Sequence, residues 1–321
     1  AISQDRKVFE GIYGYDETVI PDVERSILAR HNILLLGLRG QAKTRMARLM
    51  VNLLDEFVPY VKGSPLFEDP FNPITDVVKN SITELGDELP IEWLHRNDRY
   101  TEKLATPDVS IADLIGDIDP MKAVKQGLSY SDERVIHYGL IPRSNRGIFV
   151  INELPDLQPR IQVSLFNILQ EEDIQIRGFK LRLPLDIWFV FTANPEDYTN
   201  RGNIVTPLKD RIDSQILTHY PKDINDSLQI TEQESKLSSE QSSNIVVPRI
   251  IKELIEQIAV EARSNEFVDS KSGVSARMTI SALENLVSGC ERRCMKSHEP
   301  KTVARVGDLQ FCVPAITGKI E

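Results

Sequence analysis

The sequence has little cysteine, and its three cysteines do not form a disulfide framework. Cys290, Cys294 and Cys312 are too few and too closely grouped along 321 residues to hold an extracellular scaffold together. A metal site formed by Cys290, Cys294 and His298 on one helix face would lack a second ligand cluster, so packing is the better interpretation. Reduced cysteines agree with a cytoplasmic location.

Long apolar runs and an excess of basic charge are also missing. No run approaches the roughly 18 apolar residues that span a bilayer, and the first residues, AISQDRKVFEG, lack the apolar segment of a signal peptide. The 38 Lys and Arg residues face 48 Asp and Glu residues, which gives a net charge of −10. This balance disfavours binding to nucleic acid or to an anionic membrane. Any bound anion should therefore be small and locally held.

The composition that is present is that of a globular protein. Hydrophobic residues make up 41% and charged residues 27%, and the length allows one large or two modest domains. Three short apolar runs, at residues 33–36, 148–151 and 187–192, are typical of buried strands in a parallel sheet. Helical patterns at residues 44–57 and 158–171 follow the first two runs. This order predicts an α/β fold built from βαβ units.

A polar stretch divides the chain. Residues 226–244 are rich in Ser, Gln and Glu and predict either a mobile linker or an exposed helix. We therefore expect a large α/β domain over residues 1–225, a linker over residues 226–245 and a small, mostly helical domain over residues 246–321. Residues 63–119 are long for a connection between a strand and a helix, and they predict an insertion in the first domain.

A glycine-rich segment follows the first predicted strand. Residues 37–44 are Gly-Leu-Arg-Gly-Gln-Ala-Lys-Thr, whereas a phosphate-binding P-loop has Gly, four residues, Gly, Lys and Ser or Thr. Ala42 replaces the second glycine, which we expect to be tolerated if φ there is negative. In such a loop backbone N–H groups converge on phosphate oxygens, Lys43 would reach the β- and γ-phosphates, and Thr44 would ligate Mg²⁺. The residues predicted to bind nucleotide here are Gly37, Gly40, Gln41, Ala42, Lys43, Thr44 and Arg45.

A polar pair ends the second apolar run. Asn152 and Glu153 follow residues 148–151, in the form of a Walker B element, where an acid holds Mg²⁺ and the next glutamate polarises the attacking water. Asn152 stands where the pattern has Asp, so its amide oxygen would bind the metal without supplying negative charge. Slow hydrolysis, or a role in nucleotide binding alone, follows as an alternative to a normal ATPase. Glu153 is the candidate base.

These motifs resemble AAA+ ATPases, in particular the branch of the magnesium chelatase I subunit and the MoxR-type proteins. The form GxxGxAKT is similar to the P-loop of MoxR-type proteins. Residues 139–147 are similar to the chelatase segment that contains the helix-2 insert, and residues 174–184 to the pre-sensor-1 hairpin. The resemblance implies a P-loop NTPase αβα sandwich with a parallel sheet, followed by a small α-helical lid domain.

The resemblance also assigns further site residues by position. Asn194 matches sensor 1, Arg211 matches the arginine finger that reaches a neighbouring subunit's ATP site, and Arg277 matches sensor 2. Tyr13 and Gly14 match the segment that contacts adenine. The implied cofactors are ATP and Mg²⁺, and the implied assembly is a homo-oligomeric ring, expected to be a hexamer.

We therefore expect a cytoplasmic, ATP-hydrolysing ring motor that remodels or activates a partner protein. A partner with a von Willebrand A domain is one implication of the resemblance, and neither nucleic acid nor a membrane is an expected partner. The alternative is a nucleotide-dependent assembly switch with weak or no ATPase activity, which Asn152 motivates. A transcriptional activator of the related AAA+ kind would need a GAFTGA loop, which the sequence lacks.

Overall fold

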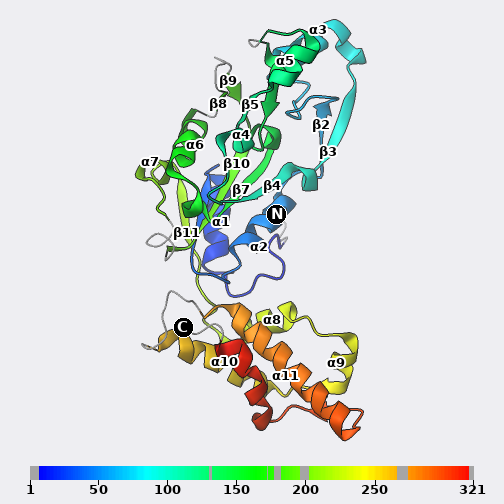
Figure 1. The fold of residues 1–321 in the computed structure, drawn as a ribbon, viewed down its shortest axis with the longest axis vertical. Coiled ribbons are helices and arrows are strands. Elements are labelled where there is room, and N and C mark those ends of the chain that lie inside the picture. The colour runs from blue at the N-terminus through cyan, green and yellow to red at the C-terminus, as the bar shows by residue number, and fades with distance from the viewer. Residues whose placement is uncertain are drawn as a thin grey trace. The chain divides into compact units, whose positions relative to one another are not determined.

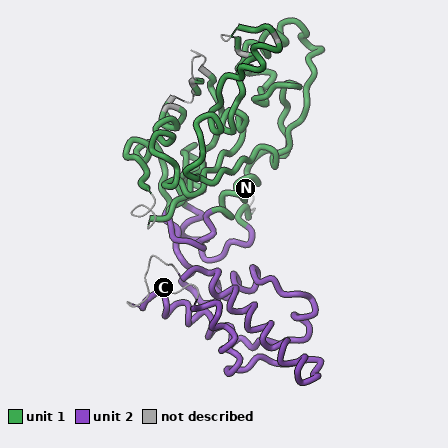
Figure 2. Tube along the Cα trace, in the orientation of Figure 1, with its two compact units in different colours: residues 1–9, 22–36, 44–216 green, residues 10–21, 37–43, 217–321 purple. Residues whose placement is uncertain are grey.

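The computed structural model describes residues 7–129, 132–171, 173–176, 182–195, 202–265 and 274–317. The chain splits into two compact units, which Figure 2 shows in different colours. Unit 1 comprises Ala1–Phe9, Asp22–Leu36 and Thr44–Ile216, and unit 2 comprises Glu10–Pro21, Gly37–Lys43 and Leu217–Glu321. Each unit has a hydrophobic core of its own.

The centre of unit 1 is a five-stranded sheet with the strand order β11-β1-β10-β7-β4 (Figure 1). The strands are β1 (Ile33–Leu36), β4 (Tyr100–Leu104), β7 (Gly147–Asn152), β10 (Ile187–Ala193) and β11 (Ser214–Leu217). The pairs β1–β10, β10–β7 and β7–β4 are parallel. Every residue of β7 is buried, as expected when helices cover both faces of a parallel sheet. The three predicted strands and the α/β class are confirmed.

The edge strand β4 lies inside the stretch that the sequence predicted as an insertion, residues 63–119. Its sequence, Tyr-Thr-Glu-Lys-Leu, is polar because an edge strand is only half-buried, so a search for apolar runs misses it. Two antiparallel strand pairs flank it in the chain: β2 (Phe57–Val61) pairs with β3 (Ile91–His95), and β5 (Gly116–Ile118) pairs with β6 (Ile136–Tyr138). The predicted insertion at residues 63–119 therefore contains a strand of the central sheet, with one antiparallel strand pair before this strand in the chain and another after it.

The helices of this part of the chain are mostly short. They are α1 (Val19–Leu28), α2 (Lys43–Leu49), α3 (Asp76–Leu85), α4 (Ile111–Leu114), α5 (Pro120–Gln126), α6 (Pro159–Glu171) and α7 (Thr206–Lys209). The helix predicted at residues 158–171 is confirmed as α6. The helix predicted at residues 44–57 is too long, because α2 ends at Leu49, a 3₁₀ turn follows, and Phe57 pairs with His95 in β2–β3.

A third antiparallel pair is formed by β8 (Asp173–Gln175) and β9 (Arg182–Pro184). It coincides with the segment that the sequence likened to the pre-sensor-1 hairpin. Residues 177–181 of that segment lie outside the described residues.

Unit 2 is mostly helical. Its helices are α8 (Ile224–Glu234), α9 (Ser239–Asn244), α10 (Arg249–Ser264), α11 (Ala276–Ser297) and α12 (Val313–Thr317), and β12 (Ile245–Val246) pairs with β13 (Thr302–Val303). Asp223 caps α8, and Ser238 caps α9 in a capping box with Gln241. The polar stretch at residues 226–244 therefore forms helices rather than a linker. The division between the units falls after Ile216, before the boundary expected at residue 225.

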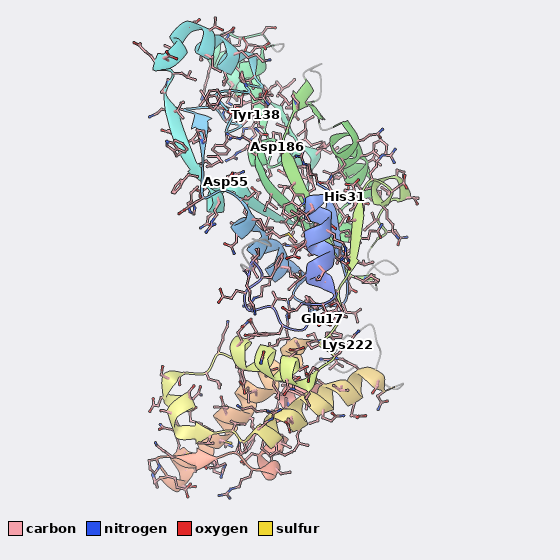
Figure 3. All side chains as sticks on the ribbon, turned by 180° about the vertical axis from the view of Figure 1, so that it is seen from behind. Glu17, His31, Asp55, Tyr138, Asp186 and Lys222 are labelled. Atoms are coloured by element: carbon pink, nitrogen blue, oxygen red, sulfur yellow. The ribbon has the colours of Figure 1, made fainter. Side chains whose placement is uncertain are left out.

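The cysteines and His31 occupy defined positions in the structure. All three cysteines are free and buried, and the described residues contain no group of three or more His, Cys, Asp or Glu side chains that could hold a metal. His31, labelled in Figure 3, precedes β1, and its Nδ1 lies 2.8 Å from Ser214 Oγ at the start of β11. Within the described ranges, no helix has both the length and the apolar character needed to cross a membrane.

Candidate nucleotide site

Four predicted site residues of unit 1 lie at the carboxyl edge of the central sheet or directly beside it. Asn152 ends β7, Glu153 follows it, and Asn194 follows the neighbouring strand β10. Thr44 lies in the first turn of α2, and its Oγ1 donates to Asn152 Oδ1 at 3.4 Å. Open α/β sheets bind their ligands at this edge, so the sequence-predicted residues converge where such a site is expected.

Asn152 is the centre of a hydrogen-bond network. Its Oδ1 also accepts from Thr192 Oγ1 at 3.1 Å, and its Nδ2 donates to Glu102 Oε1 at 2.7 Å. Asn152 is buried. Burial would raise the pKa of the Glu102 carboxyl, but hydrogen bonds from Arg48, Tyr100 and Asn152 and the Arg48 charge together bring that pKa below its usual value. A carboxylate thus lies directly behind the amide that replaces the expected aspartate.

Glu153 has a strained backbone. Its φ of 57° lies in the left-handed region, and its N–H donates to Thr192 Oγ1 at 3.1 Å. Such a conformation costs a non-glycine residue about 1–3 kcal/mol and is concentrated at functional sites. Asn194, at the end of the adjacent strand, is buried. The left-handed backbone of Glu153 turns the chain directly after β7. Its strain supports the predicted role of Glu153 as the base.

The predicted phosphate loop, residues 37–43, belongs to unit 2. A Cβ on Gly37 would lie 1.9 Å from Thr218 Oγ1 and 2.2 Å from Gln41 Oε1, and these two side-chain atoms are themselves hydrogen-bonded at 2.7 Å. Gly40 has a φ of 77°. Gly37 is therefore required by the close approach of these side chains, and Gly40 is required by its backbone conformation.

Lys43 and Ala42 close the loop. Lys43 is buried, and its Nζ donates to Gly37 O and, at 2.8 Å, to Leu38 O, so the ammonium group lies over the loop. Ala42 has a φ of 55°, so the condition under which the sequence predicted that its methyl group is tolerated, a negative φ, is not met. The loop adopts the left-handed conformation at this position although the residue is not glycine, at a cost of roughly 1–2 kcal/mol.

The segment before the loop contacts it through a residue that sequence reasoning missed. Tyr13 and Gly14 are half-buried, but the buried neighbour Tyr15 has its hydroxyl 2.9 Å from both Gln41 O and His219 O. Burial raises the pKa of Tyr15 to about 12. The adjacent aromatic residue in the motif was the available signal for this contact.

The helix that carries Arg277 also contacts the loop. Arg277 is exposed in the first turn of α11, whose N-cap is Ser275. A Cβ on Gly40 would lie 2.8 Å from Ser275 Cβ. Unit 2 therefore brings the sensor 2 candidate's helix against the phosphate loop. Arg45, the last of the predicted binding residues, lies half-buried on α2.

Arg211 is held against α6 in unit 1. Its guanidinium carbon lies 3.7 Å from the centre of the Phe166 ring, and its Nε donates to Gln170 Oε1 at 3.0 Å. Its Nη1 donates to Pro207 O at 3.1 Å. This side chain is only partly exposed and has a defined orientation on the surface of one chain.

The donors at the sheet edge fit a magnesium ion in kind. Thr44 Oγ1 and Asn152 Oδ1 are neighbouring oxygen atoms, and Mg²⁺ prefers oxygen ligands, usually few from protein and the rest from phosphates and water. Neither atom carries a charge. The carboxylate that contacts this pair belongs to Glu102, which bonds the amide nitrogen of Asn152.

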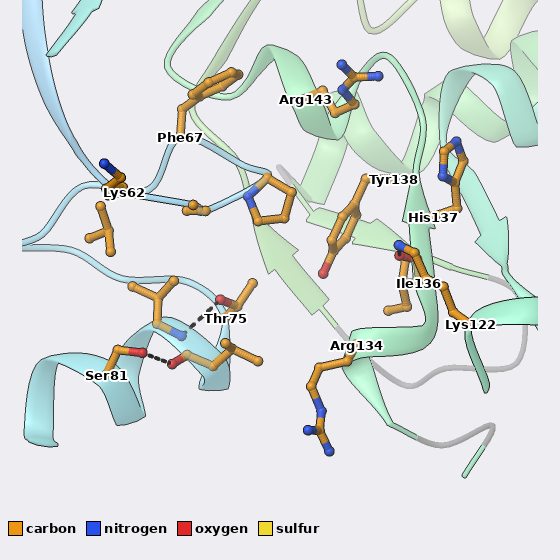
Figure 4. A pocket seen from close by; sticks show the side chains of 16 residues that line it. Lys62, Phe67, Thr75, Ser81, Lys122, Arg134, Ile136, His137, Tyr138 and Arg143 are labelled. Atoms are coloured by element: carbon orange, nitrogen blue, oxygen red, sulfur yellow. Dashed lines mark hydrogen bonds between the residues drawn. The ribbon is translucent and has the colours of Figure 1, made fainter. Parts of the chain in front are cut away.

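A separate cavity of about 680 Å³ lies in unit 1, between the β2–α3 segment and the residues around β6 (Figure 4). The described residues that line it include Lys62, Lys122, Arg134, Arg143 and His137, and none of these described lining residues is Asp or Glu. Lys62 pairs with Glu92 at 3.1 Å, and Arg134 pairs with Asp132 at 2.6 Å, so nearby acids offset part of this charge. None of the predicted nucleotide-site residues lines this cavity.

Comparison with known proteins finds a matching family model for part of the chain. Residues 83–212 match the model of the AAA domain, dynein-related subfamily. This range contains Asn152, Glu153, Asn194 and Arg211 and begins after the phosphate loop. The chain is 25% identical over 206 residues to the magnesium-chelatase 38 kDa subunit of Cereibacter sphaeroides, covering 62% of this chain and 54% of the relative. It is 25% identical over 201 residues to the subunit of the same name from Rhodobacter capsulatus, covering 62% and 51%.

The matched region spans about half the length of these relatives. Among solved structures, a model of the complex between subunits BchI and BchD of magnesium chelatase aligns with a TM-score of 0.50 at 18% identity, covering 98% of this chain and 95% of that one. NtrX from Brucella abortus in complex with ATP aligns with a TM-score of 0.50 at 13% identity, covering 96% and 58%. These two likenesses support the fold. The chain therefore has the α/β fold of P-loop NTPases, contains a segment that matches the AAA domain, and is similar in sequence to the magnesium chelatase 38 kDa subunit.

Proposed function

We propose that this chain binds and hydrolyses ATP at the carboxyl edge of its sheet. The observation that carries the proposal is the contact between Thr44, which directly follows the phosphate loop, and Asn152 at the end of β7. That contact, within unit 1, brings together the two oxygen atoms that would hold the metal. The same arrangement supports Glu153 as the group next to the attacking water.

The chemistry proposed is attack of water on the γ-phosphorus. The new P–O bond forms to the water oxygen, the bond to the bridging oxygen of ADP breaks, and Glu153 accepts the water proton. Lys43 and the loop N–H groups would bind the phosphates, and Asn194 would orient the water. Thr44 and Asn152 would hold Mg²⁺, which neutralises the charge of the phosphates when bound. Tyr13 and Gly14 would contact the base.

Arg211 is proposed to act on the nucleotide of a neighbouring subunit in a homo-oligomeric ring, with a hexamer as the expected size. Its described contacts hold the guanidinium on α6, which reduces the side-chain entropy lost when it meets a phosphate. Arg277 is proposed as sensor 2 toward the loop that contacts its own helix. Hydrolysis would then break the contacts to the γ-phosphate and change the conformation of the chain.

The ring is proposed to remodel or activate a partner protein in the cytoplasm. The similarity to the magnesium chelatase 38 kDa subunit supports a second protein subunit as the partner, as in the complex of BchI with BchD. A partner with a von Willebrand A domain is included in this proposal. Insertion of a metal into a porphyrin is not part of the proposal.

A second candidate function is a nucleotide-dependent assembly switch with little turnover. Asn152 favours it, because the amide supplies no negative charge to the metal. The switch predicts ATP-dependent oligomerisation with almost no phosphate release.

Steady-state phosphate release, measured alongside nucleotide binding, tests the proposal. We expect Lys43→Ala to lose binding and turnover and Glu153→Gln to bind ATP but not hydrolyse it, with Lys79→Ala on α3 as a surface control. Unchanged turnover in both variants would reject the proposed site. Binding and ATP-dependent assembly without turnover in the unmodified chain would select the switch.

A further inference from the structure

We propose that Glu102 is a positioning residue that fixes the Asn152 amide with its oxygen toward Thr44. In this arrangement the negative charge of the Walker B element lies one side chain behind the metal ligand instead of on it. The inference rests on the proposed function and names a residue outside the recognised motifs.

The sheet brings the two residues together. Strand β4 is parallel to β7, with Glu102 paired with Val150 and Leu104 paired with Asn152. Because side chains alternate between faces along a strand, Glu102 and Asn152 are diagonal neighbours on one face. Residues 50 positions apart in the sequence thus form a hydrogen bond of 2.7 Å.

Donor and acceptor chemistry then fixes the direction of the amide. An ionised carboxylate only accepts hydrogen bonds, so the amide nitrogen of Asn152 faces Glu102. The amide oxygen consequently faces the hydroxyl groups of Thr192 and Thr44, at 3.1 and 3.4 Å. If the amide were reversed, an amide oxygen would face a carboxylate oxygen, and both atoms would lack a proton.

Glu102 is itself anchored. Arg48 forms two hydrogen bonds to it, at 2.8 and 3.0 Å, and the Tyr100 hydroxyl donates to it at 3.0 Å. Thr44 and Arg48 are one helical turn apart on α2, so one face of that helix contacts both members of the pair. The first helix after the phosphate loop therefore fixes the metal ligand directly and through its support.

The contact between Glu102 and Asn152 predicts what happens when Asn152 is changed to the aspartate of the Walker B pattern. Asn152→Asp alone would set two carboxylates at the distance of the present hydrogen bond, which is repulsive. Glu102→Gln alone would remove the constraint on the amide direction, because glutamine can both donate and accept. The double variant Glu102→Gln/Asn152→Asp would restore one donor and one acceptor with their roles exchanged.

The experiment measures how much Mg²⁺ strengthens the binding of a fluorescent ATP analogue to the full chain, relative to EDTA. We expect this gain to fall about 10-fold in each single variant, as is typical of residues that support a metal ligand, and to return to within about 3-fold in the double variant. Glu92→Gln is the matched control, because Glu92 also bonds a tyrosine hydroxyl and a basic side chain but lies on β3. Losses that add in the double variant, or a larger gain in Asn152→Asp alone, would overturn the inference.

A second readout needs no nucleotide. Thermal unfolding of the ligand-free chain should show Asn152→Asp destabilised and the destabilisation relieved by Glu102→Gln in the same chain. Absence of relief contradicts the pairing of the two side chains. Failure of the unmodified chain to bind the analogue in Mg²⁺ would instead count against the proposed function, and the unfolding cycle would still decide the pairing.

Discussion

The guanidinium of Arg211 lies on the face of the Phe166 ring, with its central carbon 3.7 Å from the ring centre. Gln170, on the same helix as Phe166, accepts a hydrogen bond from Arg211 at 3.0 Å. The side chain proposed as an arginine finger is thus held in place by α6 of its own chain.

Phe166→Leu should weaken this support without removing the cation. A cation–π contact at a partly exposed site contributes about 0.5–1 kcal/mol, so we expect ATP turnover to fall about 2- to 5-fold while ATP affinity stays unchanged. Arg211→Ala should lower turnover by about 10³-fold or more. Turnover and equilibrium binding are measured in parallel. Equal loss of affinity in Phe166→Leu would show that the ring supports the fold of the site rather than the orientation of the arginine.

Gly37→Ala should disrupt the phosphate loop. The added methyl group would overlap Thr218 Oγ1 and Gln41 Oε1, and overpacking of this kind costs about 1–3 kcal/mol, which predicts a loss of nucleotide affinity of about 5-fold or more. Gly37→Ala/Thr218→Ala should recover part of the affinity, because one of the two overlaps is removed. Gly307→Ala is the control, since a Cβ there meets no atom within 4 Å. Nucleotide titration of the four proteins decides the outcome.

Ala42→Gly should stabilise the chain slightly. The left-handed φ of 55° costs an alanine roughly 1–2 kcal/mol, and glycine loses about 0.5–1 kcal/mol more in chain entropy on folding. The difference predicts a gain of up to about 1.5 kcal/mol in the free energy of unfolding. Ala42→Val should act in the opposite direction, because a β-branched residue tolerates this φ less well. Denaturant unfolding of the three proteins is the measurement, and a loss of stability in Ala42→Gly would contradict the account.

Glu256 should make the stability of unit 2 depend on pH. Burial is the main cause that raises the pKa of this carboxyl, although the hydroxyl of Thr231 bonds it. Because the folded pKa lies above the unfolded one, the folded chain binds more protons, and stability falls as pH rises through that range. Glu256→Gln should therefore increase stability more at pH 8, where the carboxyl of the folded chain is ionised, than near pH 4.5.

Thermal unfolding across pH tests this difference between the variant and the unmodified chain. Glu261→Gln on the exposed side of the same helix serves as the control. A gain for Glu256→Gln that did not vary with pH would show that the glutamine improves packing and that the charge of Glu256 is not the cause.

Much of the fold could be predicted because its signals are local. The three buried strands are short apolar runs, and α6 has apolar residues at helical spacing behind a proline. The composition of residues 226–244 predicts either a linker or a helix. Asp223 and Ser238 are the additional signals, because they are the N-caps of α8 and α9, respectively. Strand β4 could not be found in this way, because an edge strand with Glu102 at its centre has no apolar pattern.

The glycine-rich loop of residues 37–44, the polar pair Asn152 and Glu153 and the order of the main elements can be read from the chain alone, since each depends on neighbouring residues. The contact of Tyr15 with the loop, the left-handed backbone of Ala42 and the hydrogen bond from Asn152 to Glu102 are visible only in the folded chain. These features depend on strand order and loop closure, which bring together residues that are far apart in the sequence. The absence of a charge at Asn152 is a property of the sequence, whereas the carboxylate beside it is a property of the fold.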